Sequence, residues 1–176
     1  TKNRILVMNT PLGNLEATAE LSVGLMFSIM RNIHLANYST HQGKWEKPKF
    51  IGTELKGKTL GIVGYGNIGQ RVAEICSTIG MNIITNSKSA SEEDLSRFNA
   101  KKVSIEQLIK EADIVSIHTK LNDETKYMFN KETLSTMKPT SVIINCARGG
   151  LINEVDLKDA LNNEVIAGAA IDVYEN

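Results

Sequence analysis

Three glycines in a Gly-x-Gly-x-x-Gly pattern, Gly64, Gly66 and Gly69, follow a short apolar segment. The pattern is typical of a strand-to-helix turn that holds the pyrophosphate of a dinucleotide. The first glycine permits the tight turn, the second leaves room for the phosphates, and the third lets the helix pack closely on the strand. The free N–H groups and the positive dipole end of that helix attract anions. Residues 64–69 therefore predict a dinucleotide site.

The flanking residues decide between such a site and an ordinary glycine turn. Residues 60–63 before the turn are a strand candidate. After it, apolar residues recur on one face of a helix, at Ile68, Val72, Ile75 and Ile79. A strand, a turn and an amphipathic helix in this order favour the dinucleotide site.

The end of the next predicted strand, residues 82–85, bears on the choice of cofactor. A site for NAD usually places an acid there, on the ribose 2′-hydroxyl. Here Ser87, Lys88 and Ser89 follow instead, and the next acid is Glu92. A lysine beside small hydroxyls tolerates the 2′-phosphate of NADP, whereas Ser87 could equally hydrogen-bond an unphosphorylated ribose, so the residues leave both cofactors open.

Polar groups also end three later strands, where ligands bind in open α/β sheets. His118 ends residues 114–118, and a structural hydrogen bond is favoured there over proton transfer. Arg148 follows residues 142–145 and suits a bidentate carboxylate clamp, with a solvent-facing arginine as the alternative. The glycines that follow it at 149–150 would let a ligand approach the backbone. Asp172 would hold a polar part of the cofactor or cap a loop.

Apolar segments alternate with helical segments from residue 57 onward. The expected strands are residues 60–63, 82–85, 102–103, 114–118, 142–145 and 166–171, and the expected helices are 67–79, 104–111, 130–136 and 154–162. The strands are near-continuous apolar runs, as in a parallel sheet covered on both faces. With right-handed crossovers, the fold class predicted is α/β, a Rossmann-type doubly wound parallel sheet with helices on both faces.

The first third of the chain is organised differently. Residues 5–8 are predicted to form a short apolar strand, and residues 15–37 a helix that is apolar on more than one face. Such a helix must be buried on several sides, which indicates packing against a second domain or subunit. Residues 39–57 are polar and indicate a surface connection.

The composition excludes several classes of function. The chain has 20 basic and 20 acidic residues in 176, so no electrostatic partner such as a nucleic acid is indicated. The longest apolar stretch, residues 21–30, is too short to span a bilayer, and no signal-peptide pattern opens the chain. Cys76 and Cys146 lack metal-ligand spacing and are expected to be buried in a reducing compartment. We expect a cytoplasmic protein without a metal, a membrane or a nucleic-acid partner.

The chain resembles the D-2-hydroxyacid dehydrogenase family over essentially its whole length. The segments that carry the resemblance are Val7–Pro11, Gly43-Lys44-Trp45-Glu46-Lys47, Gly57-Lys58-Thr59-Leu60-Gly61, the glycine turn, Asn145-Cys146-Ala147-Arg148-Gly149-Gly150 and Gly168–Val173. The resemblance implies two Rossmann-like domains with a cleft between them. Residues 15–176 would be the dinucleotide-binding domain, and residues 1–14 a hinge at the edge of the substrate domain.

The same resemblance assigns roles by position. It implies that the cofactor is lined by Gly64, Gly66, Asn67, Ile68, Gly69, Ser87, Thr119, Cys146, Ala147, Arg148 and Asp172. Arg148 is also the expected catalytic residue, because it would bind the substrate carboxylate and polarise its carbonyl. Two positions depart from the family: Ser87 replaces an aspartate and Lys120 replaces a proline. NAD is thus the expected cofactor, with NADP possible because of Ser87.

Within the family, the resemblance is closest to members that oxidise D-3-phosphoglycerate to 3-phosphohydroxypyruvate, the entry step of serine synthesis. An NADP-linked glyoxylate or hydroxypyruvate reductase is the first alternative. A cofactor-sensing interaction protein, similar to the corepressors built on this fold, is the second.

The resemblance also implies what the chain lacks. The family's acid–base histidine and its partner glutamate, and most of the substrate domain, have no counterpart in these residues. The chain is therefore expected to bind cofactor without turning substrate over by itself. Family members dimerise through their cofactor domains, so a homodimer that uses residues 15–37 is expected.

Overall fold

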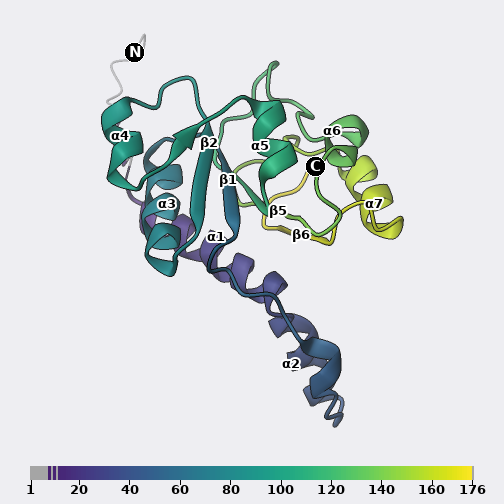
Figure 1. The fold of residues 1–176 in the computed structure, drawn as a ribbon. Helices are drawn as coiled ribbons and strands as arrows, with labels where there is room; N and C mark the ends of the chain where they lie inside the picture. The colour runs from purple at the N-terminus through teal and green to yellow at the C-terminus, as the bar shows by residue number, and fades with distance from the viewer. Residues whose placement is uncertain (1–7, 9, 11, 176) are drawn as a thin grey trace.

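A parallel β-sheet with helices on both faces forms the body of the molecule (Figure 1). The computed structural model describes residues 8, 10 and 12–175. Within these residues the six strands lie in the order β3-β2-β1-β4-β5-β6. The strands are β1 (Thr59–Val63), β2 (Asn82–Asn86), β3 (Lys101–Lys102), β4 (Ile114–Ile117), β5 (Val142–Asn145) and β6 (Gly168–Ile171). The predicted doubly wound parallel sheet is confirmed.

The helices cover this sheet and extend beyond it. They are α1 (Leu15–Met30), α2 (Ile33–His41), the 3-10 turn η1 (Lys47–Phe50), α3 (Asn67–Ile79), α4 (Glu92–Arg97), α5 (Ile105–Glu111), α6 (Lys131–Ser135) and α7 (Glu154–Asn162). Figure 1 shows α2 projecting from the body as an arm, whereas α1 runs beneath the sheet. The strand order reverses between β1 and β4, which creates the crevice where open α/β sheets bind their ligands.

Except in β3, whose two lysines are exposed, alternate apolar residues of the strands enter two separate cores. On one face, Leu60 and Ile62 of β1 pack in a cluster with Met26 of α1 and Val72 of α3. On the other face, Val63 packs in a cluster that includes residues of α5, α6 and α7. Burial on both faces explains why the strands read as continuous apolar runs.

The amino ends of three strands are joined by Asp113. Its carboxylate accepts hydrogen bonds from the Thr59 N–H at 2.8 Å and from Lys138 Nζ at 2.8 Å. Its backbone donates to the Thr59 carbonyl and accepts from the Val142 N–H. Burial raises the pKa of the Asp113 carboxyl, but the hydrogen bonds that it accepts from Lys138 and from the Thr59 N–H outweigh this effect, so the pKa is lowered. This residue fixes the relative positions of β1, β4 and β5 at the edge opposite the crevice.

The helix predicted over residues 15–37 is wrong as a single element. It breaks after Met30, where Asn32 adopts a left-handed conformation with φ 53°. The returning chain causes the break, because the Thr53 N–H donates to the Met30 carbonyl at 2.7 Å. A Cβ on Gly52 would lie 2.5 Å from the Arg31 Cα, so the two segments cross in direct backbone contact.

The structure contains one helix that was not predicted, and two predictions for the start of the chain are not tested by it. The six-residue helix α4 was not expected, although Ser91 and Asp94 form a capping box at its start. The predicted strand at 5–8 lies outside the described residues except for Met8, and the hinge at 1–14 stays a prediction. Among the described helices, none has both the length and the apolar character that crossing a membrane requires.

Candidate functional site

A cavity of about 340 Å³ lies at the carboxyl ends of β1, β2 and β4. It occupies the crevice where the strand order reverses. Its lining combines the glycine turn with the residues that follow β2 and β4. The lining residues are Val63, Gly64, Tyr65, Gly66, Asn86, Ser87, Lys88, Ser89, His118, Thr119, Lys120, Asn122, Glu124, Thr125 and Met128.

The three glycines of the turn meet three different surroundings. Gly64 has φ +93°, and a Cβ there would lie 2.6 Å from the His118 carbonyl oxygen. A Cβ on Gly69 would lie 2.2 Å from the carbonyl oxygen of Gly64, so α3 sits directly on the end of β1. A Cβ on Gly66 would meet no atom within 4 Å. The predicted turn and packing roles of Gly64 and Gly69 are confirmed, and Gly66 faces open space.

The start of α3 is the anion-attracting part of this turn. Gly66 is the N-cap residue, and no side chain caps the helix. Asn67 is exposed and Ile68 is half-buried. The first N–H groups of a helix have no partner inside it. Uncapped N–H groups beside an open space form the cradle that a pyrophosphate requires.

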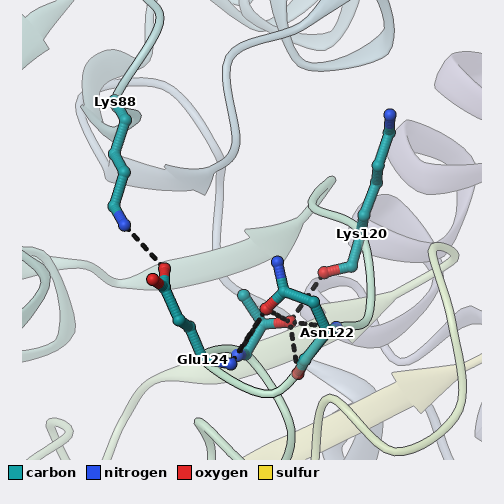
Figure 2. A network of polar contacts seen from close by, with 5 residues as sticks. Lys88, Lys120, Asn122 and Glu124 are labelled. Atoms are coloured by element: carbon teal, nitrogen blue, oxygen red, sulfur yellow. Dashed lines mark hydrogen bonds and ion pairs between the residues drawn. The ribbon is translucent and has the colours of Figure 1, made fainter.

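The end of β2 forms the second wall of the cavity. The Gly64 N–H donates to the Asn86 carbonyl at 2.9 Å, which joins this strand end to the glycine turn. Ser87 is half-buried, and its Oγ lies 3.5 Å from the Oγ of Ser89. Lys88 extends over the cavity and pairs with Glu124, a residue of the loop after β4 (Figure 2). This wall of the cavity is therefore built of hydroxyls and one ion pair.

His118 is a structural residue of the third wall. Its Nε2 lies 2.8 Å from the Oγ of Ser116, which is fully buried. Burial lowers the pKa of His118 to about 4, so the imidazole is neutral near pH 7. This hydrogen bond agrees with the expectation of a structural role.

The loop that carries Arg148 is folded around the side chain of Asn145. Asn145 is 2% exposed, donates from Nδ2 to the Arg148 carbonyl at 2.9 Å and accepts from the Ala147 N–H at 3.0 Å. The Arg148 side chain is exposed, and its Nη1 donates to the Ala147 carbonyl at 2.6 Å. Among the described residues no carboxylate pairs with it. The guanidinium is thus accessible to an external anion.

Gly149 has a different role from the one expected. A Cβ there would lie 2.0 Å from the Tyr174 carbonyl oxygen, because the segment after β6 crosses this glycine. The lack of a side chain at Gly149 makes room for the backbone at Tyr174. The prediction was that it would make room for a ligand. Gly150, with φ +78°, supplies a left-handed turn.

Cys146 and Asp172 lie beside the arginine loop at neighbouring strand ends. The Asp172 N–H donates to the Asn145 carbonyl at 3.0 Å. Cys146 is 8% exposed, and its burial raises the pKa of the thiol. A hydrogen bond with Ser22 lowers this pKa in part, and the charge of Asp172 adds a smaller raising effect. Both cysteines are buried and unpaired, as expected. In the described part of the chain, no cluster of metal-ligating side chains occurs.

The structure separates the predicted site residues into groups. Gly64, Gly66, Ser87 and Thr119 line the cavity. Asn67, Ile68 and Gly69 form the first turn of α3. Cys146, Ala147, Arg148 and Asp172 follow β5 and β6 at the same sheet edge, outside the walls of that cavity.

Sequence reasoning missed two residues that shape this site. The sequence pattern predicts Asn145 only as the end of a strand, whereas its side-chain amide holds the arginine loop. Glu124 was not considered, although it follows Asn122 and Asp123 in a loop directly after a predicted strand. The place of Glu124 in a loop after a predicted strand, where open α/β sheets bind ligands, is the feature of the sequence that could have identified it.

A doubly wound parallel sheet with an uncapped glycine turn in its crevice defines a dinucleotide-binding domain. Residues 23–176 match the family model described as D-isomer specific 2-hydroxyacid dehydrogenase, NAD binding domain. The chain belongs to this dehydrogenase family, and the matched part is the family's cofactor-binding domain.

Individual relatives show how much of such a protein this chain represents. It is 41% identical to a D-3-phosphoglycerate dehydrogenase of Bacillus subtilis over 175 residues, which cover 99% of the chain and 33% of that protein. It is 42% identical to a hydroxypyruvate reductase of Thermotoga maritima, with 97% and 55% covered. A D-isomer specific 2-hydroxyacid dehydrogenase from Lactobacillus delbrueckii ssp. bulgaricus, in its NAD complexed form, matches with a TM-score of 0.88 and 34% identity. That match covers 99% of this chain and 53% of the other. The chain thus spans about a third of the Bacillus relative.

We predict that the imidazole of His118 does not titrate near neutral pH. Its NMR titration midpoint is expected at about 4, below the ordinary value of 6.5. Between these two pH values the unfolded chain binds more protons, so the free energy of unfolding decreases as the pH is lowered through this window. The His118→Gln variant should lack that share of the decrease. A midpoint at or above 6.5 would contradict the structural role.

Proposed function

We propose that this chain is the cofactor-binding domain of a cytoplasmic NAD-linked dehydrogenase that oxidises D-3-phosphoglycerate to 3-phosphohydroxypyruvate. One observation carries the cofactor part: the space at Gly66 is open, and the uncapped start of α3 lies beside it. Family membership supports a nicotinamide dinucleotide as the occupant. The match to the Bacillus subtilis enzyme, together with the other D-3-phosphoglycerate dehydrogenases of similar identity, supports the substrate.

In this proposal the residues of the chain bind and orient. The first turn of α3 holds the pyrophosphate, and Ser87 hydrogen-bonds the adenosine ribose. Thr119, Cys146, Ala147 and Asp172 line the remainder of the cofactor. A bound nicotinamide dinucleotide would supply the hydride acceptor for the oxidation at C2 of the substrate, whose hydroxyl would lose a proton. Residues outside this chain would take that proton.

Arg148 has the properties of a substrate anchor. Its exposed guanidinium pairs with no carboxylate in the described part of the chain, and Asn145 fixes the backbone that carries it. A guanidinium binds a carboxylate through two parallel hydrogen bonds. The same group polarises the adjacent carbonyl as it forms, which favours the transition state.

A hydroxypyruvate reductase is the second candidate for the whole protein. The Thermotoga maritima reductase is as similar to this chain as the phosphoglycerate dehydrogenases are. The hydroxyls and the lysine after β2 also suit NADP. Both candidates share the hydride transfer and the arginine anchor, and they differ in the substrate.

A homodimer through α1 and α2 completes the proposal. The arm α2 and the segment that follows it bear large apolar side chains in solvent: Leu35 is 48% exposed, Tyr38 68% and Trp45 83%. An apolar surface on a projecting element is typical of a protein interface. A second copy of this chain is the partner that we propose.

The cofactor assignment predicts the effect of filling the space at Gly66. In Gly66→Val the side chain projects into open space, so the free energy of unfolding should change by less than about 1 kcal/mol. The affinity for NADH should decrease at least about tenfold, because the valine occupies the place of the pyrophosphate. Calorimetric titration of this chain measures the affinity. Gly24→Val is the matched control, since a Cβ there also meets nothing within 4 Å, and undiminished NADH binding by Gly66→Val would refute the site.

The substrate assignment predicts the behaviour of Arg148→Lys in the whole enzyme that carries this domain. Losing the two parallel hydrogen bonds should lower kcat/KM for D-3-phosphoglycerate about a hundredfold. Arg97→Lys, an exposed arginine on α4, should change it less than twofold. Faster turnover of hydroxypyruvate with NADPH than of D-3-phosphoglycerate with NAD would favour the reductase instead.

The dimer predicts a concentration-dependent mass. Sedimentation at high micromolar concentration should give a dimer for the native chain and a monomer for Leu35→Glu, because a buried carboxylate opposes association. Val155→Glu, which places the same charge at an exposed apolar position of α7, should remain dimeric. A monomeric native chain would rule out this interface.

A further inference from the structure

An ion pair spans the cavity between two loops that are far apart in the sequence. Lys88 follows β2, Glu124 lies after β4, and Lys88 Nζ lies 2.6 Å from Glu124 Oε2 (Figure 2). Both residues line the cavity. Their side chains are 90% and 72% exposed, so the pair contributes little to stability. Its importance lies in where it places charge.

The Glu124 backbone is held in place, unlike that of an ordinary surface acid. The Asn122 Oδ1 accepts hydrogen bonds from the N–H groups of Glu124 and Thr125, both at 3.0 Å. The Thr125 Oγ1 donates to the Lys120 carbonyl at 2.7 Å, which closes the loop on itself (Figure 2). These hydrogen bonds fix the backbone of the turn from which the Glu124 carboxylate reaches Lys88.

The charges around the cavity are few. The charged residues among its lining are Lys88, Lys120 and Glu124, because His118 is neutral near pH 7. Figure 2 shows the Lys120 ammonium extending away from the pair. Lys88 is thus the cation beside Ser87 and Ser89, and Glu124 neutralises it.

This arrangement bears on the phosphate that distinguishes NADP from NAD. A 2′-phosphate bound after β2 needs a free cation there, and a carboxylate nearby repels it. The usual acid is missing from position 87. Glu124, on the loop after β4, provides a carboxylate that lines the same cavity and pairs with the ammonium that the phosphate would need.

We propose that Glu124 is the residue that makes this site select NAD over NADP, by holding Lys88 away from a 2′-phosphate. The inference rests on the proposed cofactor-binding function. It assigns the selectivity to an ion pair across the cavity instead of to the residue at the end of β2. Removing the Glu124 charge converts Lys88 into a phosphate contact.

The test is titration of this 176-residue chain with NADH and NADPH, for the native chain and for Glu124→Gln. The native chain should bind NADH more tightly. In Glu124→Gln the Kd for NADPH should decrease about tenfold while the Kd for NADH changes less than twofold. The gain should be smaller at high salt, because exposed charges are screened.

Two variants make the test specific. Asp123→Asn removes the same charge from the adjacent residue, which does not line the cavity, and should leave the NADPH-to-NADH ratio unchanged. Adding Lys88→Met to Glu124→Gln should abolish the larger part of the gain, because the freed ammonium is what binds the phosphate.

The outcomes separate this inference from the function beneath it. An unchanged ratio in Glu124→Gln, an equal effect of Asp123→Asn, or a gain that persists without Lys88 would each overturn the selectivity role while cofactor binding stands. Failure of the native chain to bind either dinucleotide would overturn the proposed function and this inference with it. Circular dichroism identifies any variant that fails to fold.

Discussion

The contact between Gly69 and the Gly64 carbonyl is the constraint on which the site depends. It seats the first turn of α3 on the end of β1, at a distance that no side chain at 69 permits. Gly64 in turn presses against the backbone after β4, at His118. These two backbone approaches bring the helix start and two strand ends to one point. The cavity exists because these three segments meet there without side chains between them.

The opposite edge of the sheet makes this arrangement rigid. Asp113 joins the amino ends of β1, β4 and β5, so their carboxyl ends keep a fixed spacing. The backbone of each strand therefore determines where the polar groups at its carboxyl end lie. Asn145 shows the principle, since its buried amide converts the end of β5 into a shaped loop. The fold thus positions the site mainly through main-chain geometry, and a few side chains adapt it.

Local patterns made the sheet and α3 predictable. The apolar runs of β1 and β5 and the helical spacing after Gly66 each depend on residues close together in the sequence. The break between α1 and α2 was not predictable from local patterns. The Thr53 N–H, which donates a hydrogen bond to the Met30 carbonyl, lies more than twenty residues further along the chain. The same reason hid the pairing of Lys88 with Glu124. Residue types at strand ends could be predicted, whereas contacts between loops could not.

The prediction for Gly149 was also wrong. A glycine is required there because another segment of the chain crosses it, and not because a ligand approaches. The carbonyl of Tyr174 lies where its side chain would be. Beyond the crossing, Glu175 is held by Tyr127 and Glu154, through hydrogen bonds of 3.0 Å and 2.7 Å. The arginine loop and the segment after β6 are therefore in direct backbone contact. A displacement of that segment would therefore move the backbone next to Arg148 directly, because the Tyr174 carbonyl oxygen is packed against Gly149.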